Sequence, residues 1–312
     1  MRISHDQLDL LALCRVKGVD WNLLAREAQR PGGLGRLRAG EVTENTPAAR
    51  EQAALLVAAE DDLDRHRQAV LAEVRRAEDV DARLLTVLDP QYPRTLRLIF
   101  NLPPFLFVQG AIREADLRSV AVVGTRRATD LGIRRAVSMA RQLVAAGVTV
   151  VSGLARGIDT AAHTAALEAD GRTIAVIGTG ITQCYPKENR ALADRIAKAG
   201  AVVSQFWPSA HPATWTFPRR NVTMSGIAQG TVVIEASATS GAKMQARLAL
   251  QHGKKLFLLR SLVDTYPWAA KYATQRGAYV VEDVAGVLRE LADPAAIRDE
   301  DARRVQLGLG LG

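Results

Sequence analysis

With 312 residues, 48% of them hydrophobic, the chain is long enough for about two domains with a sizeable buried core. The formal net charge is +8, and residues 121–290 contain 21 Lys+Arg against 11 Asp+Glu, so the positive excess lies in one segment. Such a segment favours a polyanionic partner, although a basic surface without a partner is equally compatible with charge alone.

Composition also excludes several classes of protein. No apolar run approaches the roughly 18 residues of a membrane span, and charged residues interrupt the N-terminal segment, unlike a signal peptide. Cys14 and Cys184 are too few and too distant in sequence for a disulfide framework or a zinc site. We therefore expect a cytoplasmic protein that binds no metal, no cofactor and no membrane.

Residues 1–78 are predicted to form a small helical domain. Apolar stretches at 8–14 and 23–25 and a long, charged helix over 53–74 are separated by Pro31-Gly32-Gly33 and Thr46-Pro47, which are typical breaks between helices. The following segment is richer in proline, and its apolar runs predict two short strands joined by turns. These two strands are expected at 84–88 and 105–108.

From residue 119 onward, short apolar runs alternate with helical segments, which is typical of a parallel sheet buried on both faces. Residues 79–292 are therefore predicted to be an extended α/β domain with a Rossmann-like, doubly wound parallel sheet, and 293–312 a flexible tail. The predicted strands are 120–123, 148–151, 174–177, 201–204, 231–234, 255–259 and 278–280, and the predicted helices are 131–146, 158–169, 189–199 and 242–252.

Glycine and basic residues follow several predicted strands. Ligands of open parallel sheets bind beyond the carboxyl ends of the strands, where glycine permits close approach and helix N-termini attract phosphate. Four such loops at one edge, three of them basic, together with a basic segment around Phe217, predict a groove that follows a phosphate backbone. The candidate binding residues are Gly124, Thr125, Arg126, Arg127, Ser152, Gly153, Arg156, Gly157, Tyr185, Lys187, Asn189, Phe217, Arg219, Arg220, Asn221, Ser240, Gly241 and Lys243.

Other ligand classes fit the motifs less well. Gly178-Thr179-Gly180 begins like a dinucleotide fingerprint, but Gln183 stands at its sixth position, and no P-loop sequence occurs. His163 is interpreted as a helix-packing residue and Glu235 as a carboxylate that orients its loop. No catalytic residue is assigned. Aromatic residues near the basic loops either stack on bases or pack at loop ends: Tyr185, Phe206, Trp207, Trp215 and Phe217.

Four motifs then carry a resemblance. They are Gly124-Thr125-Arg126, Ser152 to Asp159, Gly178 to Asn189, and Phe217 to Asn221. Their order and spacing resemble the bacterial DNA-processing protein A (DprA/Smf) family over about residues 82–260. The resemblance implies a homodimeric, non-enzymatic cytoplasmic protein that protects incoming single-stranded DNA and helps load RecA recombinase during natural transformation and recombination. It also implies that the arginines, lysine and asparagine of these motifs line the DNA pocket, and that residues 1–78 are a SAM-like domain.

The sequence also departs from the family. Gln245 replaces a threonine of the family, and residues 260–267 replace its usual glycine-rich loop.

The alternative function is a LOG-like phosphoribohydrolase or a nucleotide sensor. The loop at 235–241 lacks the P-G-G and the downstream glutamate of those hydrolases, which favours the binding protein. The expected homodimer rests on the resemblance and on Leu256–Leu259, interpreted as an exposed edge.

Overall fold

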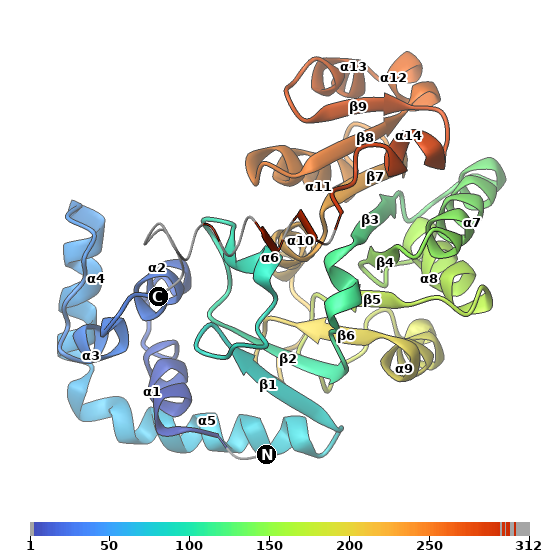
Figure 1. The fold of residues 1–312 in the computed structure, drawn as a ribbon. Helices are drawn as coiled ribbons and strands as arrows, with labels where there is room; N and C mark the ends of the chain where they lie inside the picture. Colours follow the sequence, from blue (N-terminus) through green and yellow to red (C-terminus); the bar gives the residue numbers. More distant parts are fainter. Residues whose placement is uncertain (1–2, 294, 297, 300–302, 304–312) are drawn as a thin grey trace.

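One nine-stranded sheet runs through the molecule in a computed structural model that describes residues 3–293, 295–296, 298–299 and 303 (Figure 1). Its strands are β1 (Ala82–Thr86), β2 (Phe105–Gly110), β3 (Ser119–Gly124), β4 (Thr149–Ser152), β5 (Thr173–Val176), β6 (Ala201–Ser204), β7 (Gly230–Glu235), β8 (Lys255–Leu259) and β9 (Ala278–Val281). Their order is β1-β2-β6-β5-β4-β3-β7-β8-β9. Every pairing from β6 to β9 is parallel, whereas β2 pairs antiparallel with both β1 and β6.

Helices cover the two faces of this sheet. Successive side chains of a strand point to opposite faces, so each face has its own apolar core. In β3, Val120 and Val122 belong to one apolar cluster, whereas Ala121 and Val123 belong to the other. The first cluster contains residues of α7 and α8, and the second contains residues of α10 and α11. The helices of this part are α6 (Arg94–Arg97), α7 (Asp130–Ala145), α8 (Ile158–Glu168), α9 (Arg190–Ala199), α10 (Thr216–Ile227), α11 (Gly241–Gln251), α12 (Arg260–Thr265), α13 (Pro267–Ala273) and α14 (Val284–Leu288).

The predicted doubly wound α/β fold is confirmed, with most element ends within two residues of those expected. Helix α10 was not predicted. Its buried face includes Asn221, Thr223 and Ser225, so the apolar repeat that marks a helix is weak. Pro218 is tolerated because it lies in the first turn, where a backbone N–H has no intrahelical partner. Helix α12 lies in the segment 260–267 that was expected to be a loop, and α13, which follows it, was not predicted either.

Five helices precede the sheet and lie beside its β1 end (Figure 1). The indole of Trp21 packs on Phe105 of β2 at 5.1 Å between ring centroids and on Trp207 at 6.0 Å. Glu73 accepts hydrogen bonds from the backbone N–H and hydroxyl of Ser209, at 3.0 and 2.8 Å. The helical segment therefore shares its core with the sheet. Its helices are α1 (His5–Leu13), α2 (Trp21–Ala28), α3 (Gly33–Arg38), α4 (Pro47–Ala58) and α5 (Leu63–Glu78).

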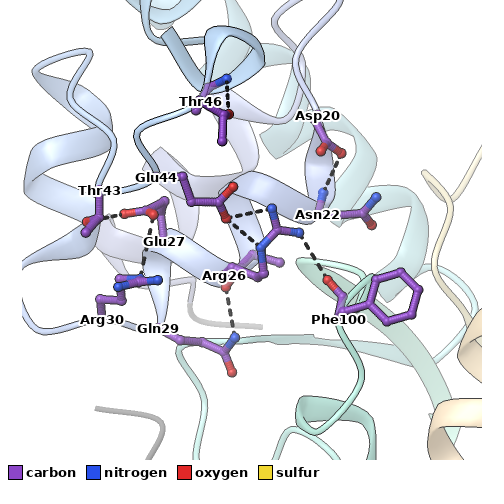
Figure 2. A network of polar contacts seen from close by, with 12 residues as sticks. Asp20, Asn22, Arg26, Glu27, Gln29, Arg30, Thr43, Glu44, Thr46 and Phe100 are labelled. Carbon is purple, nitrogen blue, oxygen red and sulfur yellow. Dashed lines mark hydrogen bonds and ion pairs between the residues drawn. The ribbon is translucent and has the colours of Figure 1, made fainter. Parts of the chain in front are cut away.

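A polar network also ties α2 to the chain that precedes β2 (Figure 2). Arg26 donates to Glu44 through Nε at 2.8 Å and to the carbonyl of Phe100 through Nη1 at 3.0 Å. On the same helix the buried carboxylate of Glu27 accepts from the hydroxyl of Thr43 at 2.8 Å. These contacts orient the helical segment, while its description as a separate domain ending at residue 78 stays a prediction.

The edge of the sheet differs from our expectation. Leu256–Leu259 do not form an exposed edge, because β8 pairs with β7 on one side and β9 on the other, and these side chains are at most 5% exposed. The interpretation of Leu256–Leu259 as an exposed edge was therefore wrong, and the expectation of a homodimer rests on the resemblance alone. The expected flexible tail, 293–312, lies mostly outside the described residues. Each helix in the described part of the chain is too short or too polar to cross a bilayer.

Candidate nucleic-acid interface

A crevice lies between the loops that follow the neighbouring strands β3 and β7. Strands β3 and β7 are neighbours, but the helices that follow them, α7 and α11, pack on opposite faces of the sheet. The two connecting loops therefore diverge beyond the carboxyl ends of the strands, at the position where open α/β sheets bind ligands. The crevice has a volume of about 410 Å³ and is bounded by these two loops, the β4–α8 loop and helix α10. This volume is in the range of small-ligand pockets.

The loop after β3 supplies two exposed arginines. Arg126 lies over the ring of Phe217, with 5.3 Å from its guanidinium carbon to the ring centroid. The backbone N–H of Thr125 donates to the carbonyl of Glu235 at 2.7 Å, which joins this loop to β7. Within the described residues, neither Arg126 nor Arg127 forms an ion pair with a carboxylate, so both charges face solvent at the crevice.

Glu235 holds the beginning of α7. Its carboxylate accepts hydrogen bonds from the backbone N–H and hydroxyl of Thr129, the N-cap residue of α7, at 3.2 and 2.8 Å. The same Thr129 hydroxyl accepts from the N–H of Gly132 at 3.0 Å. Both observations agree with the interpretation of Glu235 as a carboxylate that orients its loop.

Arg220 is a buried arginine at the base of the site. Its guanidinium donates to the carbonyls of Gly153 and Val176 and to Asn221 Oδ1. Asp159 lies nearby and accepts from the backbone N–H groups of Gly153 and Ala155, at 3.1 and 3.3 Å. Burial raises the pKa of Asp159, although the charge of Arg220 opposes this shift. Arg220 is therefore committed to holding the β4–α8 loop beneath the crevice.

Two aromatic rings stand beside the crevice. Tyr185 is 45% exposed, and its ring centroid lies 5.7 Å from that of Phe217. Phe217 is itself covered by Arg126, so an arginine and two rings form one continuous surface. A small adjoining cavity is lined by this group and by Arg156. An exposed aromatic surface flanked by guanidinium groups can stack on unpaired bases.

The β4–α8 and β5–α9 loops meet at an ion pair. Arg156 Nε donates to Glu188 Oε1, and both side chains are more than half exposed. This contact lowers the pKa of Glu188 and raises that of Arg156. Lys187 is exposed and forms no ion pair with any described carboxylate. Gly157 permits the approach of the loops, because it has φ of +75° and a Cβ there would lie 2.5 Å from the carbonyl oxygen of Thr125.

The fourth loop presents a helix end. Ser240 caps α11 by accepting from the N–H of Ala242 at 3.2 Å, and Gly241 has no atom near the position of a Cβ. Lys243 is half-buried on the first turn. Gln245 lines the crevice and is only 1% exposed. Its Nε2 donates to the Thr231 hydroxyl at 3.4 Å, and its Oε1 has no hydrogen-bond partner among the described residues.

The candidate residues thus fall into two groups. Most lie at the carboxyl edge with exposed or half-buried side chains: Gly124, Thr125, Arg126, Arg127, Arg156, Gly157, Tyr185, Lys187, Phe217, Arg219, Ser240, Gly241 and Lys243. The others are buried beneath it: Ser152, Gly153, Asn189, Arg220 and Asn221. Ser152 donates to the carbonyl of Val122 at 2.7 Å, and Asn189 to the carbonyl of Leu154 at 2.9 Å, so both support the loops.

Sequence reasoning missed several residues of the crevice, among them Met224, Met244 and the part taken by Gln245. They lie on α10 and α11 rather than on glycine-rich loops. The sequence offered one hint, the glutamine at position 245 where the family has threonine. This substitution did not indicate that the side chain of Gln245 is buried at the crevice.

Comparison with known proteins assigns the family. The profile of the DNA recombination-mediator protein A family matches residues 83–292, a range that includes all four loops and α10. The chain belongs to this family. DNA processing protein DprA of Streptococcus pneumoniae is 37% identical over 206 residues, covering 66% of this chain and 73% of that protein. Protein Smf of Synechocystis is 39% identical over 186 residues, covering 58% of this chain but only 47% of its own length.

Solved structures of the DprA family share the fold. The crystal structure of S. pneumoniae DprA superimposes with a TM-score of 0.73 at 28% identity, covering 94% of this chain and 100% of that one. DNA processing protein A of Helicobacter pylori, described for its unique single-stranded DNA binding mode, superimposes with a TM-score of 0.59 at 24% identity. This superposition covers 70% of this chain and 96% of the H. pylori chain. The DprA fold is therefore shown for this chain, including its α/β sheet.

Proposed function

We propose that this DprA-family protein binds single-stranded DNA along the carboxyl edge of its sheet and processes it for recombination. The observation that carries the proposal is the exposed surface of Arg126, Phe217 and Tyr185 beside a crevice that is also lined by Arg127, which pairs with no described carboxylate. Basic groups attract the phosphates, and the rings stack on bases that duplex DNA keeps paired. The S. pneumoniae and H. pylori relatives, named for DNA processing and single-stranded DNA binding, support this proposal.

The same family membership supports a proposal for the finer role. We propose that the protein acts in the cytoplasm as a homodimer without enzymatic activity, protects incoming single strands during natural transformation, and helps to load RecA recombinase. The hydrogen bonds of Asp159 to the β4–α8 loop and of Glu235 to Thr129 support a binding role, because both carboxylates serve to hold loops of the crevice.

A salt titration with an oligo-dT strand tests DNA binding. Four phosphate contacts, from Arg126, Arg156, Lys187 and Arg219, predict a slope of log K against log salt of about −3, at roughly −0.7 per contact. Arg126→Ala or Lys187→Ala flattens the slope by about 0.7. Arg141→Ala is the matched control, because this exposed arginine lies towards the C-terminal end of α7 and pairs with Glu168. Equal slopes for Arg126→Ala and the wild type would refute the groove.

Two further measurements separate the alternatives. Tyr185→Ala lowers affinity by about 1–3 kcal/mol with little change of slope, since a stacked ring neutralises no phosphate. The volume of the crevice also admits a mononucleotide, which is the ligand of the alternative function. Incubation with AMP followed by an assay for free adenine tests it, and adenine release that requires the crevice would support a phosphoribohydrolase.

A further inference from the structure

Trp215 is an exposed indole outside the crevice. Its side chain is 57% exposed, and it stands at the N-cap of α10, two residues before Phe217. Tryptophan at such exposure gains little from burial, so packing alone does not account for it. Trp215 lines neither the crevice between the loops after β3 and β7 nor the small cavity beside it.

Two neighbours hold the indole in place. The ring of Phe206, only 2% exposed, meets it nearly at right angles, at 5.8 Å between centroids. Arg219, one turn along α10, places its guanidinium carbon 5.6 Å from the indole centroid. Arg219 is exposed and has no ion pair with a described carboxylate. The indole is therefore an ordered surface beside an available positive charge.

The same combination occurs at the crevice, where Arg126 lies over Phe217. The two surfaces flank the beginning of α10, because side chains two residues apart on a helix do not face each other. Only Thr216 stands between Trp215 and Phe217, so their Cα atoms are at most about 7 Å apart. The surrounding chain is also favourable for a polyanion, since residues 201–234 contain no aspartate or glutamate. A strand that leaves Phe217 can reach Trp215 without passing a carboxylate of this segment.

We propose that Trp215 and Arg219 form a second stacking platform, which binds the base and phosphate of a nucleotide next to the one held at Tyr185 and Phe217. The indole stacks on the base, and Arg219 pairs with the adjacent phosphate. This proposal rests on the proposed function, and it extends the binding site from the crevice over the beginning of α10.

Abasic scanning of a bound strand tests the platform. A series of oligo-dT strands, each with one abasic nucleotide, is bound to the full-length wild type, Trp215→Ala and Trp215→Phe. The wild type loses about tenfold in affinity when the abasic nucleotide occupies the platform, within the range known for base stacking. Trp215→Ala loses about tenfold on intact oligo-dT and becomes insensitive to that abasic position. Trp215→Phe binds almost as tightly as the wild type, but the bound strand quenches less of its tryptophan fluorescence.

Phe100→Ala is the matched control. Phe100 is 58% exposed and packs on His252, which follows the end of α11 remote from the crevice. Its removal leaves affinity and the abasic profile unchanged. Unchanged affinity of Trp215→Ala overturns the platform, whereas the proposed function still stands if Lys187→Ala weakens binding. Unchanged DNA affinity together with a shift of oligomeric mass in light scattering would also overturn it, and would assign Trp215 to a protein contact.

Discussion

The guanidinium of Arg220 lies directly against the Cα of Gly153: a Cβ built on Gly153 would meet Arg220 Nη1 at 2.0 Å. The same nitrogen donates to the carbonyls of Gly153 and Val176, so it cannot move aside without losing both bonds. A glycine is thus required at position 153 by a side chain that is distant in the sequence, and the loop of the crevice depends on this contact.

We expect Gly153→Ala to lower the free energy of unfolding by about 1–3 kcal/mol, because the added methyl overpacks a buried site. Urea denaturation followed by circular dichroism measures this loss. Gly241→Ala is the control, since no described atom beyond its chain neighbours and its own helix backbone lies within 4 Å of its Cβ position, and alanine favours the helix. A similar loss for both variants would contradict the contact with Arg220.

Arg219 and Arg220 are neighbours with opposite roles. Arg220→Met leaves two buried carbonyls without a donor and Asp159 without its nearby positive charge, so we expect a loss of about 3 kcal/mol or more of unfolding free energy. Arg219→Met removes an exposed charge and should leave stability unchanged while weakening single-strand binding. Urea melts and oligo-dT titrations of both variants check the distinction, which fails if the two stability losses agree.

Glu188 competes with DNA for Arg156 in the proposed interface. Glu188→Gln removes the charge that pairs with Arg156 and repels phosphate, so we expect affinity to rise several-fold. The salt slope should stay at about −3, because Arg156 is already one of the four phosphate contacts. The control is Glu168→Gln, which releases Arg141 near the opposite edge of the sheet. Equal gains for the two variants would show a general effect of net charge rather than release of Arg156.

His163 makes stability depend on pH. Burial lowers its pKa from 6.5 to about 3, so the folded protein keeps it neutral while the unfolded chain takes up a proton below pH 6.5. Stability is therefore retained above pH 6.5 and falls as the pH drops towards 3, by about 2 kcal/mol between pH 7 and 5 from this group. Urea denaturation at both values should show a smaller difference for His163→Asn. An unchanged difference would assign the pH dependence to other groups.

The fold could be predicted from sequence because its signals are local. Four apolar residues in a row, such as those of β3 and β8, indicate strands buried on both faces, and the intervening segments have helical length. A parallel arrangement then places the loop after each strand at one edge, so the glycine and arginine residues of Gly124–Arg127 and 152–157 were expected together. The order of the strands was not predicted, because strand pairing leaves no pattern in the sequence. Helix α10 was not predicted, because its buried face is partly polar and lacks the apolar repeat of a helix.

The roles of individual side chains were decided only by tertiary structure. Arg219 and Arg220 look equivalent in the sequence, yet successive residues of α10 point about 100° apart, so one faces solvent and the other faces the β4–α8 loop. Likewise, the contact of Arg126 with Phe217 and that of Arg156 with Glu188 join segments that are distant along the chain. The sequence by itself determined which edge carries the basic loops, and the packing of α10 against that edge decided which charges remain available to a ligand.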